Sequence, residues 1–367
     1  MLNRLLHCIV ALSILAVAHT VLAWSNKEHI QLTRLAIERL VADPSTPPAM
    51  AAWLKSAGGS LLNADGERDY FLHQRVGLIP RAVDGIPYWA TMPDMAALTD
   101  QSYKTIEPFG VGERLLHYID LEHFMPESKD RFYKNDLSHK PRFEDVPRDL
   151  KDPRWKAAGF LPWRVEDCYK KLVAALRAGK LTDASGQYPR DDHAGKWAGY
   201  LAHYLEDNTQ PQHATADYKS RFYFAGPASK SPNVHWDTEG RLMDDEFNDY
   251  MNLREEYWPM LVKMLEAEKD PIESNDPWVA TMQVSLISYD ALPLIGGAAM
   301  AGYKVGGTPE APQGAAGTFN ADSFFHFKGK YLGREMTFLE MKAFQHAWAA
   351  KRVMRLYRQA WDEAQKN

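Results

Sequence analysis

The strongest chemical signal in the sequence is a histidine and an aspartate one helical turn apart. His203 and Asp207 are separated by four positions, so on a helix their side chains lie on one face. Pro211 is expected to end that helix, and His213 follows on the turn. Nitrogen and oxygen donors at this spacing suit a zinc ion. The plain alternative is a core histidine that is hydrogen-bonded to the carboxylate one turn away.

A second pair repeats this spacing further along the chain. His235 and Glu239 are again four positions apart, with a glutamate in place of the aspartate. Asp237 lies between them but off that face, so we expect it to be a solvated group or a support for a ligand. Taken alone, this second unit is a weak signal, like the first.

Three further units contribute one candidate ligand each. His117 stands in the apolar segment Leu116–Asp120, where a lone histidine is usually structural. Asp94 is expected on a loop behind a proline, and His29 lies five positions after Trp24. Each of these units is a weak signal by itself.

The first 23 residues have the pattern of an export signal. Arg4 gives a positive start, and Ile9–Ala18 form an uncharged apolar core. Val21 and Ala23 are small residues at the positions that a signal peptidase inspects. The core is shorter than the roughly 20 residues of a membrane span, so cleavage is favoured over a retained anchor. Cleavage would leave Trp24 as the first residue of a secreted or periplasmic chain.

Taken in order along the chain, these units resemble one family. It comprises the bacterial zinc-dependent phospholipases C and the fungal-type single-strand-specific zinc nucleases, which share a helical fold and a trinuclear zinc centre. Their pattern is an N-terminal Trp, a nearby His, an Asp, a His-Tyr pair, the motif H-x3-D-x5-H, and then H-x3-D or H-x3-E. The matching residues are Trp24, His29, Asp94, His117, His203, Asp207, His213, His235 and Glu239. The segment Leu201–Ala214 carries the most specific part of the match.

The resemblance implies three zinc ions, two of them bridged by one carboxylate. The ligands would be Asp94, His117, His203 and Asp207 for the first ion; His213, His235 and Glu239 for the second; and His29, Asp207, and the amino nitrogen and carbonyl oxygen of Trp24 for the third. The implied reaction is in-line attack by a zinc-bound hydroxide on the phosphorus of a phosphodiester. Asp94 would be a plain ligand or would also orient or deprotonate the attacking water, and both roles stay open.

The resemblance divides the substrate class between a phospholipid headgroup and single-stranded nucleic acid. Glu239 in place of Asp and the absence of paired cysteines are similar to the phospholipases C, which are our first interpretation. The short step from Trp24 to His29 resembles the nucleases, which implies the alternative of a single-strand-specific endonuclease and 3'-nucleotidase. An alternative of another class is a secreted zinc-binding protein without catalysis.

Basic and aromatic side chains bear on the same question. Ala97 stands where the nucleases often carry a basic phosphate clamp, although Arg81 or Lys104 could take that role. Aromatic side chains near the metal motifs could stack on a base or contact a choline headgroup, but packing in the core is their commoner role. These aromatic residues are Tyr88, Trp89, Tyr118, Phe124 and Trp236.

Composition narrows the remaining function classes. The net charge is −5 and no basic run occurs, so the chain lacks the electrostatic footprint of a tight duplex binder. Cys168 has no intrachain partner once Cys8 leaves with the signal, so stability must come from the core or from bound metal. No protein partner and no stable membrane span are predicted, and we expect a monomer.

Secondary-structure elements must position these candidate ligands. The helical periodicity of the sequence predicts an all-α, multi-helix fold. Apolar residues recur at helical spacing, whereas two-residue alternation is scarce. The predicted helices cover residues 28–41, 48–57, 164–178, 194–208, 236–266, 276–292 and 335–364. We expect a single helical domain over 24–367, with long irregular loops near 121–162 and 303–333. The apolar stretch 292–303 is predicted to be a buried turn, because Pro293 and three glycines disfavour a membrane span.

Overall fold

Helices make up most of the chain in the computed structural model, which confirms the predicted all-α fold. The structure describes residues 24–59, 61, 84–98, 104–125, 140–181, 193–226, 230–243, 250–267, 269–309 and 311–366. The predicted export signal over 1–23 and Arg81 lie outside these described residues.

The described helices and strands have the following bounds. The α-helices are α2 (Asn26–Ala42), α3 (Pro48–Ala57), α5 (Gly85–Ala90), α6 (Met92–Leu98), α7 (Trp155–Ala158), α8 (Leu161–Arg177), α9 (Ala194–Thr209), α10 (Val234–Thr238), α11 (Gly240–Met243), α12 (Met251–Ala267), α13 (Pro277–Tyr289), α14 (Leu292–Gly302), α15 (Ala321–Phe325) and α16 (Phe338–Ala364). Short 3-10 helices are η2 (Glu113–Leu116), η3 (Leu121–Phe124), η5 (Phe143–Asp145), η6 (Pro211–Ala214) and η7 (Arg221–Tyr223). The strands β1 (Gly306–Thr308) and β2 (Ala311–Gln313) form one antiparallel pair, and β3 (Lys328–Tyr331) and β4 (Arg334–Thr337) form another.

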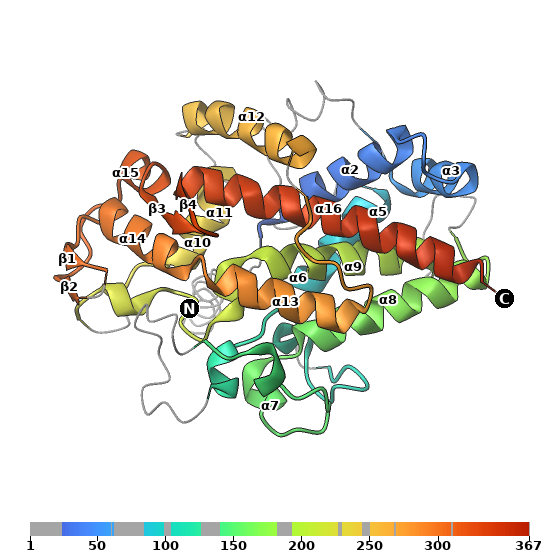
Figure 1. Ribbon diagram of the computed structural model, residues 1–367, viewed down its shortest axis with the longest axis horizontal. Coiled ribbons are helices and arrows are strands. Elements are labelled where there is room, and N and C mark those ends of the chain that lie inside the picture. Colours follow the sequence, from blue (N-terminus) through green and yellow to red (C-terminus); the bar gives the residue numbers. More distant parts are fainter. Residues whose placement is uncertain are drawn as a thin grey trace, which may run out of the picture.

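The long last helix, α16, runs across the molecule and packs against α2, α8, α9 and α12 (Figure 1). Its start is fixed by a capping box, in which the Thr337 hydroxyl accepts from Glu340 N and the Glu340 carboxylate accepts from Thr337 N. The apolar side of this helix is buried and includes Phe338, Met341, Phe344, Trp348 and Leu356. Helices from both ends of the sequence therefore share one core.

The helix α14 occupies the apolar stretch for which a buried turn was predicted, and α13 lies in the preceding stretch that was predicted to be helical. Residues 292–302 are helical, so the predicted buried turn is wrong in shape, although the segment is buried as expected. Pro293 stands in the first helical turn, where its missing N–H is not needed. Pro277–Gly302 has the length and apolarity of a membrane span, but 78% of its most apolar window is buried inside the protein.

Two of the coarse predictions need correction. The long helix predicted over 236–266 is broken into α10, α11 and α12. The loop predicted over 303–333 contains β1, β2, α15 and β3. The turn from β3 to β4 has Leu332 and Gly333 at positive φ, as in a two-residue hairpin loop. Of the loop predicted over 121–162, the described part holds only η3, η5, α7 and the first residues of α8.

Candidate metal centre

The helix α9 carries His203 and Asp207 on its buried face. Both side chains are fully buried, and His203 Nε2 lies 3.2 Å from Asp207 Oδ2. Gly199, one turn before His203, faces α5, and a Cβ at this position would lie 2.4 Å from Trp89 Cβ. The close approach of α5 to α9 therefore depends on a glycine. This approach places Ala90, at the end of α5, next to His203.

Main-chain carbonyls fix the orientation of two imidazoles. His203 Nδ1 lies 2.7 Å from the oxygen of Ala90, and His213 Nδ1 lies 2.7 Å from the oxygen of His117. Because a carbonyl oxygen only accepts, each Nδ1 must carry a proton, so in the neutral ring the lone pair lies on Nε2. Metal-binding histidines are usually held in this way by a bond from the second ring nitrogen.

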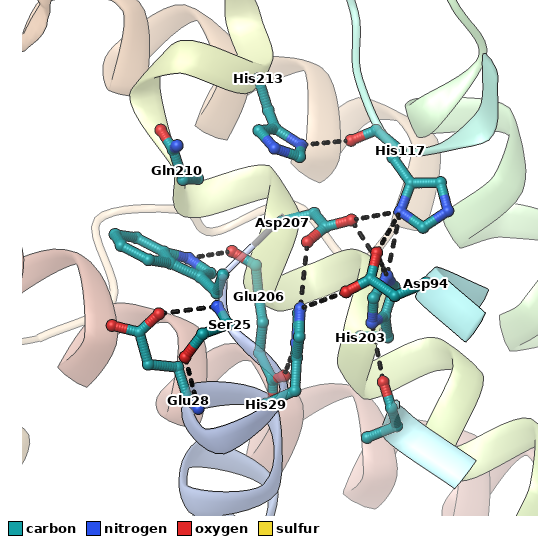
Figure 2. A network of polar contacts seen from close by, with 12 residues as sticks. Ser25, Glu28, His29, Asp94, His117, His203, Glu206, Asp207, Gln210 and His213 are labelled. Carbon is teal, nitrogen blue, oxygen red and sulfur yellow. Dashed lines mark hydrogen bonds and ion pairs between the residues drawn. The ribbon is translucent and has the colours of Figure 1, made fainter. Parts of the chain in front are cut away.

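Four side chains from α6, α9 and the residue after η2 converge on one point (Figure 2). His117 Nδ1 lies 3.0 Å from His203 Nε2, 3.1 Å from Asp207 Oδ2 and 3.5 Å from Asp94 Oδ1. His203 Nε2 is also 3.8 Å from Asp94 Oδ1. A single imidazole nitrogen cannot hydrogen-bond to three neighbours at once, whereas a tetrahedral cation with bonds of about 2.0–2.2 Å holds its ligand atoms about 3.3–3.6 Å apart. These four atoms therefore fit one small cation.

His29 on α2 completes a second group beside the first. Its Nε2 lies 3.5 Å from Asp207 Oδ1 and 3.8 Å from Asp94 Oδ2, so both aspartates direct one oxygen to each group. His29 Nε2 and Asp207 Oδ1 are buried and have no hydrogen-bond partner in the described part of the chain. Buried polar atoms are rarely left in this state, which indicates an absent ligand between them. His29, His203 and Asp207 lie close enough together to hold a metal ion. Because His203 Nε2 has one lone pair and faces the first group, His29 and the second oxygens of Asp207 and Asp94 are left for this ion.

The third group lies on η6, α10 and the residue that follows α10. Glu239 Oε1 is 2.9 Å from His235 Nε2 and 3.5 Å from His213 Nε2. The two imidazole rings stack with their centroids 5.2 Å apart, so both Nε2 atoms face the same carboxylate. This group, too, is buried and could hold a metal ion.

Burial controls the protonation of these groups. Burial lowers the pKa of His29 and of His203 to about 4, so both are neutral at pH 7 and can donate a lone pair. Burial raises the pKa of Asp207, but the neighbouring imidazoles outweigh it and hold that pKa well below its usual range. For His213, burial lowers the pKa, but Glu239 and Asp207 outweigh it and raise the pKa to about 9.

Glu206 is a site residue that the sequence interpretation missed. Its carboxylate lies 2.6 Å from His29 Nδ1 and accepts from the Thr33 hydroxyl at 2.9 Å. Its main-chain oxygen accepts from the indole N–H of Trp24 at 2.8 Å, which places Trp24 beside the group of His29 and Asp207. The sequence signal that could have identified Glu206 is its place beside Asp207, as a second acidic residue in a mostly apolar helix.

All nine predicted ligands lie in or beside the three groups, but some details were wrong. Asp94 is in the first turn of α6 and not on a loop. Asp237 is buried, and accepts from Arg241 and from the Tyr303 hydroxyl, so it is a structural group and not a solvated one.

The candidate substrate-binding side chains are divided between surface and core. Phe124 is buried and packs against Trp155. The other four aromatic candidates, Tyr88, Trp89, Tyr118 and Trp236, are half-buried. Lys104 is exposed, and Ala97 is half-buried.

A comparison with protein-family models and with curated protein sequences finds no match for this chain.

Proposed function

We propose that this chain is a phosphodiester hydrolase whose centre holds three zinc ions. The observation that supports it most is the buried set of four donor atoms that includes Asp207 Oδ2, whose separations of 3.0–3.8 Å are close to those of one tetrahedral coordination sphere. Imidazole nitrogens and carboxylate oxygens without thiolates are a donor set that zinc accepts, and catalytic zinc sites favour it. The three groups would hold the ions in the arrangement that the family resemblance implies.

Zinc ions bound here would lower the pKa of a coordinated water towards neutrality and neutralise charge on a phosphoryl group. The protein supplies the rest of the chemistry. Asp207 bridges the first two groups with separate oxygens and so fixes their spacing. The carbonyls of Ala90 and His117 and the carboxylate of Glu206 hold the imidazoles in one orientation.

Asp94 is the proposed catalytic residue among the ligands. Its two oxygens lie 3.5 Å from His117 Nδ1 and 3.8 Å from His29 Nε2, so the side chain spans two groups. It is therefore placed to orient the attacking water or to hold its proton while the phosphorus is attacked.

For the substrate, a phospholipid headgroup is our first candidate, because Glu239 resembles the corresponding residue of the phospholipases C. Single-stranded nucleic acid is a second candidate that a specific observation favours. Within the described part of the chain, the one large hydrophobic side chain that is exposed is Leu332, at 41%. An enzyme that works on a bilayer needs apolar surface to enter the interface, whereas one that works on nucleic acid does not.

A parallel assay separates these candidates. The purified chain is incubated with phosphatidylcholine vesicles, single-stranded DNA and RNA, each with and without a chelator. Turnover of vesicles alone, abolished by the chelator, supports the phospholipase and excludes the nuclease. Turnover of nucleic acid alone does the reverse. Bound zinc without turnover of any phosphodiester would identify a non-catalytic zinc-binding protein.

The proposal also depends on export. The amino nitrogen of Trp24 becomes available as a ligand only after cleavage before this residue. One extra residue before Trp24 should displace that amine and reduce the zinc content by one equivalent, as measured by mass spectrometry of the native protein. An unchanged zinc content in this variant would show that Trp24 is not a ligand.

A further inference from the structure

A buried lysine on α16 contacts both sides of the metal centre without being a candidate ligand. The Lys342 side chain is fully buried, and its ammonium lies 2.6 Å from Glu28 Oε1, which is also fully buried. The same ammonium donates to the main-chain oxygens of Thr238 at 2.6 Å and Glu239 at 3.3 Å. Lysine has three N–H donors, and here they reach two segments that are far apart in the sequence.

The first of these segments is the start of the chain expected after cleavage. Glu28 closes a capping box with Ser25, in which Glu28 Oε2 accepts from Ser25 N at 2.8 Å. The Lys342 ammonium also lies 4.3 Å from the centre of the Trp24 ring, on which it makes a cation–π contact. One turn further along α16, His346 packs edge-on against the same ring at 4.2 Å. Thus α16 holds Trp24 and, through Glu28, the first turn of the helix that carries His29.

The second segment is the turn at the end of α10. Thr238 and Glu239 leave this short helix there, so their carbonyls have no full set of partners within it. By accepting from Lys342, these carbonyls fix the main chain of Glu239, whose carboxylate faces His213 and His235. The position of this carboxylate is therefore tied to the same lysine that holds the amino-terminal segment.

A buried ion pair does not by itself explain this arrangement. Exchanging a buried pair for neutral side chains of similar volume is often neutral for stability, so charge balance alone does not require a lysine. A neutral replacement would lack the N–H groups of the lysine, which donate hydrogen bonds to two main-chain carbonyls.

We infer that Lys342 is a positioning residue that sets the amino-terminal segment and the Glu239 turn relative to each other. The group of His29 and Asp207 and the group of His213, His235 and Glu239 then reach their metal-binding geometry through one shared contact. The inference rests on the proposed zinc centre. The group of Asp94 and His117 shares Asp207 with the group of His29, but its other ligands lie on α6, on α9 and after η2, so its affinity should fall less than that of the other two groups.

The test compares Lys342→Met, Glu28→Gln and the double variant Glu28→Gln/Lys342→Met. Glutamine at 28 keeps the capping box, which accepts either Glu or Gln at that position. The single variants each leave one buried charge unpaired and should lose stability, whereas the double variant removes both charges and should regain part of that stability. Lys351→Met is the matched control, because Lys351 lies on the same helix and donates to the carbonyl of Met264 at 3.1 Å.

The readouts are zinc equivalents by elemental analysis, zinc affinity by chelator competition, and the Tm of the metal-free protein. In the double variant we expect a Tm above those of the single variants and below that of the wild type, because the Thr238 and Glu239 carbonyls lose a donor. Two zinc equivalents should be weakened about 10- to 100-fold, and the third should be weakened least. If the double variant binds all zinc equivalents with wild-type affinity, Lys342 serves only as a counter-ion for Glu28, and the inference is overturned. Equal weakening of all equivalents would also overturn it, since that indicates general loosening.

These outcomes are distinct from those for the proposed function. A wild-type chain that binds zinc but hydrolyses no phosphodiester would contradict the function and leave the role of Lys342 intact. A wild-type chain that hydrolyses phosphodiesters, with a double variant that binds zinc normally, would contradict only the role of Lys342. Absence of zinc binding by the wild type would overturn both.

Discussion

At the scale of single residues, the hydrogen bond made by one ring nitrogen of a histidine determines whether the other nitrogen can bind a metal. In His203 and His213 the hydrogen-bonding nitrogen donates to a carbonyl, and in His29 it meets the Glu206 carboxylate. In the neutral ring the remaining nitrogen holds the lone pair and faces the centre in one orientation; His213, whose pKa is raised to about 9, must release a proton when an ion binds. Supporting residues of this kind should affect metal affinity more than they affect the fold.

Replacement of Glu206 tests this expectation. Glu206→Leu removes the acceptor for His29 Nδ1 and should weaken the binding of the ion at His29 about 10- to 100-fold. Glu206→Gln keeps one acceptor oxygen and should bind with intermediate affinity. Chelator competition followed by elemental analysis measures both variants. Normal zinc affinity in Glu206→Leu would show that the carboxylate does not orient the imidazole.

Replacement of Asp94 decides between its two proposed roles. Because both of its oxygens face ligand atoms, we expect Asp94→Asn to lose zinc affinity by at least about 100-fold, with turnover falling in parallel. Zinc content and turnover are measured on the same preparation. A variant that keeps its full zinc content and loses turnover would instead assign Asp94 to the proton of the attacking water.

At the scale of secondary-structure elements, α9 is the helix on which the centre is assembled. It carries His203, Glu206 and Asp207 along one buried side, and it packs against α2, α5, α8 and α16. The packing of α5 depends on Gly199, where a Cβ would lie 2.4 Å from Trp89 Cβ and 2.7 Å from the Ile86 oxygen. Displacement of α5 would move both the carbonyl that orients His203 and the adjoining α6 with Asp94.

A methyl group at Gly199 should therefore affect stability and metal binding together. Gly199→Ala is expected to cost about 1–3 kcal/mol of unfolding free energy through overpacking and to weaken zinc binding. Gly179→Ala is the control: its Cβ would meet nothing within 4 Å, but φ is +67°, so only backbone strain is added. Denaturant unfolding and chelator competition measure the two effects. Normal zinc affinity in Gly199→Ala would separate α5 packing from the site.

At the scale of the whole molecule, the centre joins segments from nearly the full length of the chain. The ligand groups draw on α2, α6, α9, η6 and the α10 turn, and α16 contacts several of these elements. The buried acidic side chains at their meeting point repel one another unless a cation lies among them. Bound metal should therefore contribute to global stability, since Cys168 is a free buried cysteine and no disulfide is present among the described residues.

Removal of metal should lower the Tm of the wild-type chain. A ligand at 100 times its Kd stabilises the native state by about 2.7 kcal/mol for each site, so a chelator should produce a clear drop. Calorimetry with and without chelator measures this drop, and added zinc should reverse it. An unchanged Tm in chelator would contradict a metal contribution to the stability of the fold.

The residue types and spacings were sufficient to predict the helical fold, and the family resemblance selected nine residues that lie in or beside three buried groups. A four-residue spacing on a helix places two side chains on one face whatever the rest of the chain does, so His203 with Asp207 and His235 with Glu239 could be paired from the sequence. The helical position of Asp94 and the burial of Asp237 could not be predicted from the sequence, because local turn signals do not reveal which other segments contact a residue. Glu206, Gly199 and Lys342 act through neighbours up to 314 positions away, as in the contact between Lys342 and Glu28. Only tertiary packing creates such contacts, since it alone determines which buried charge meets which carbonyl.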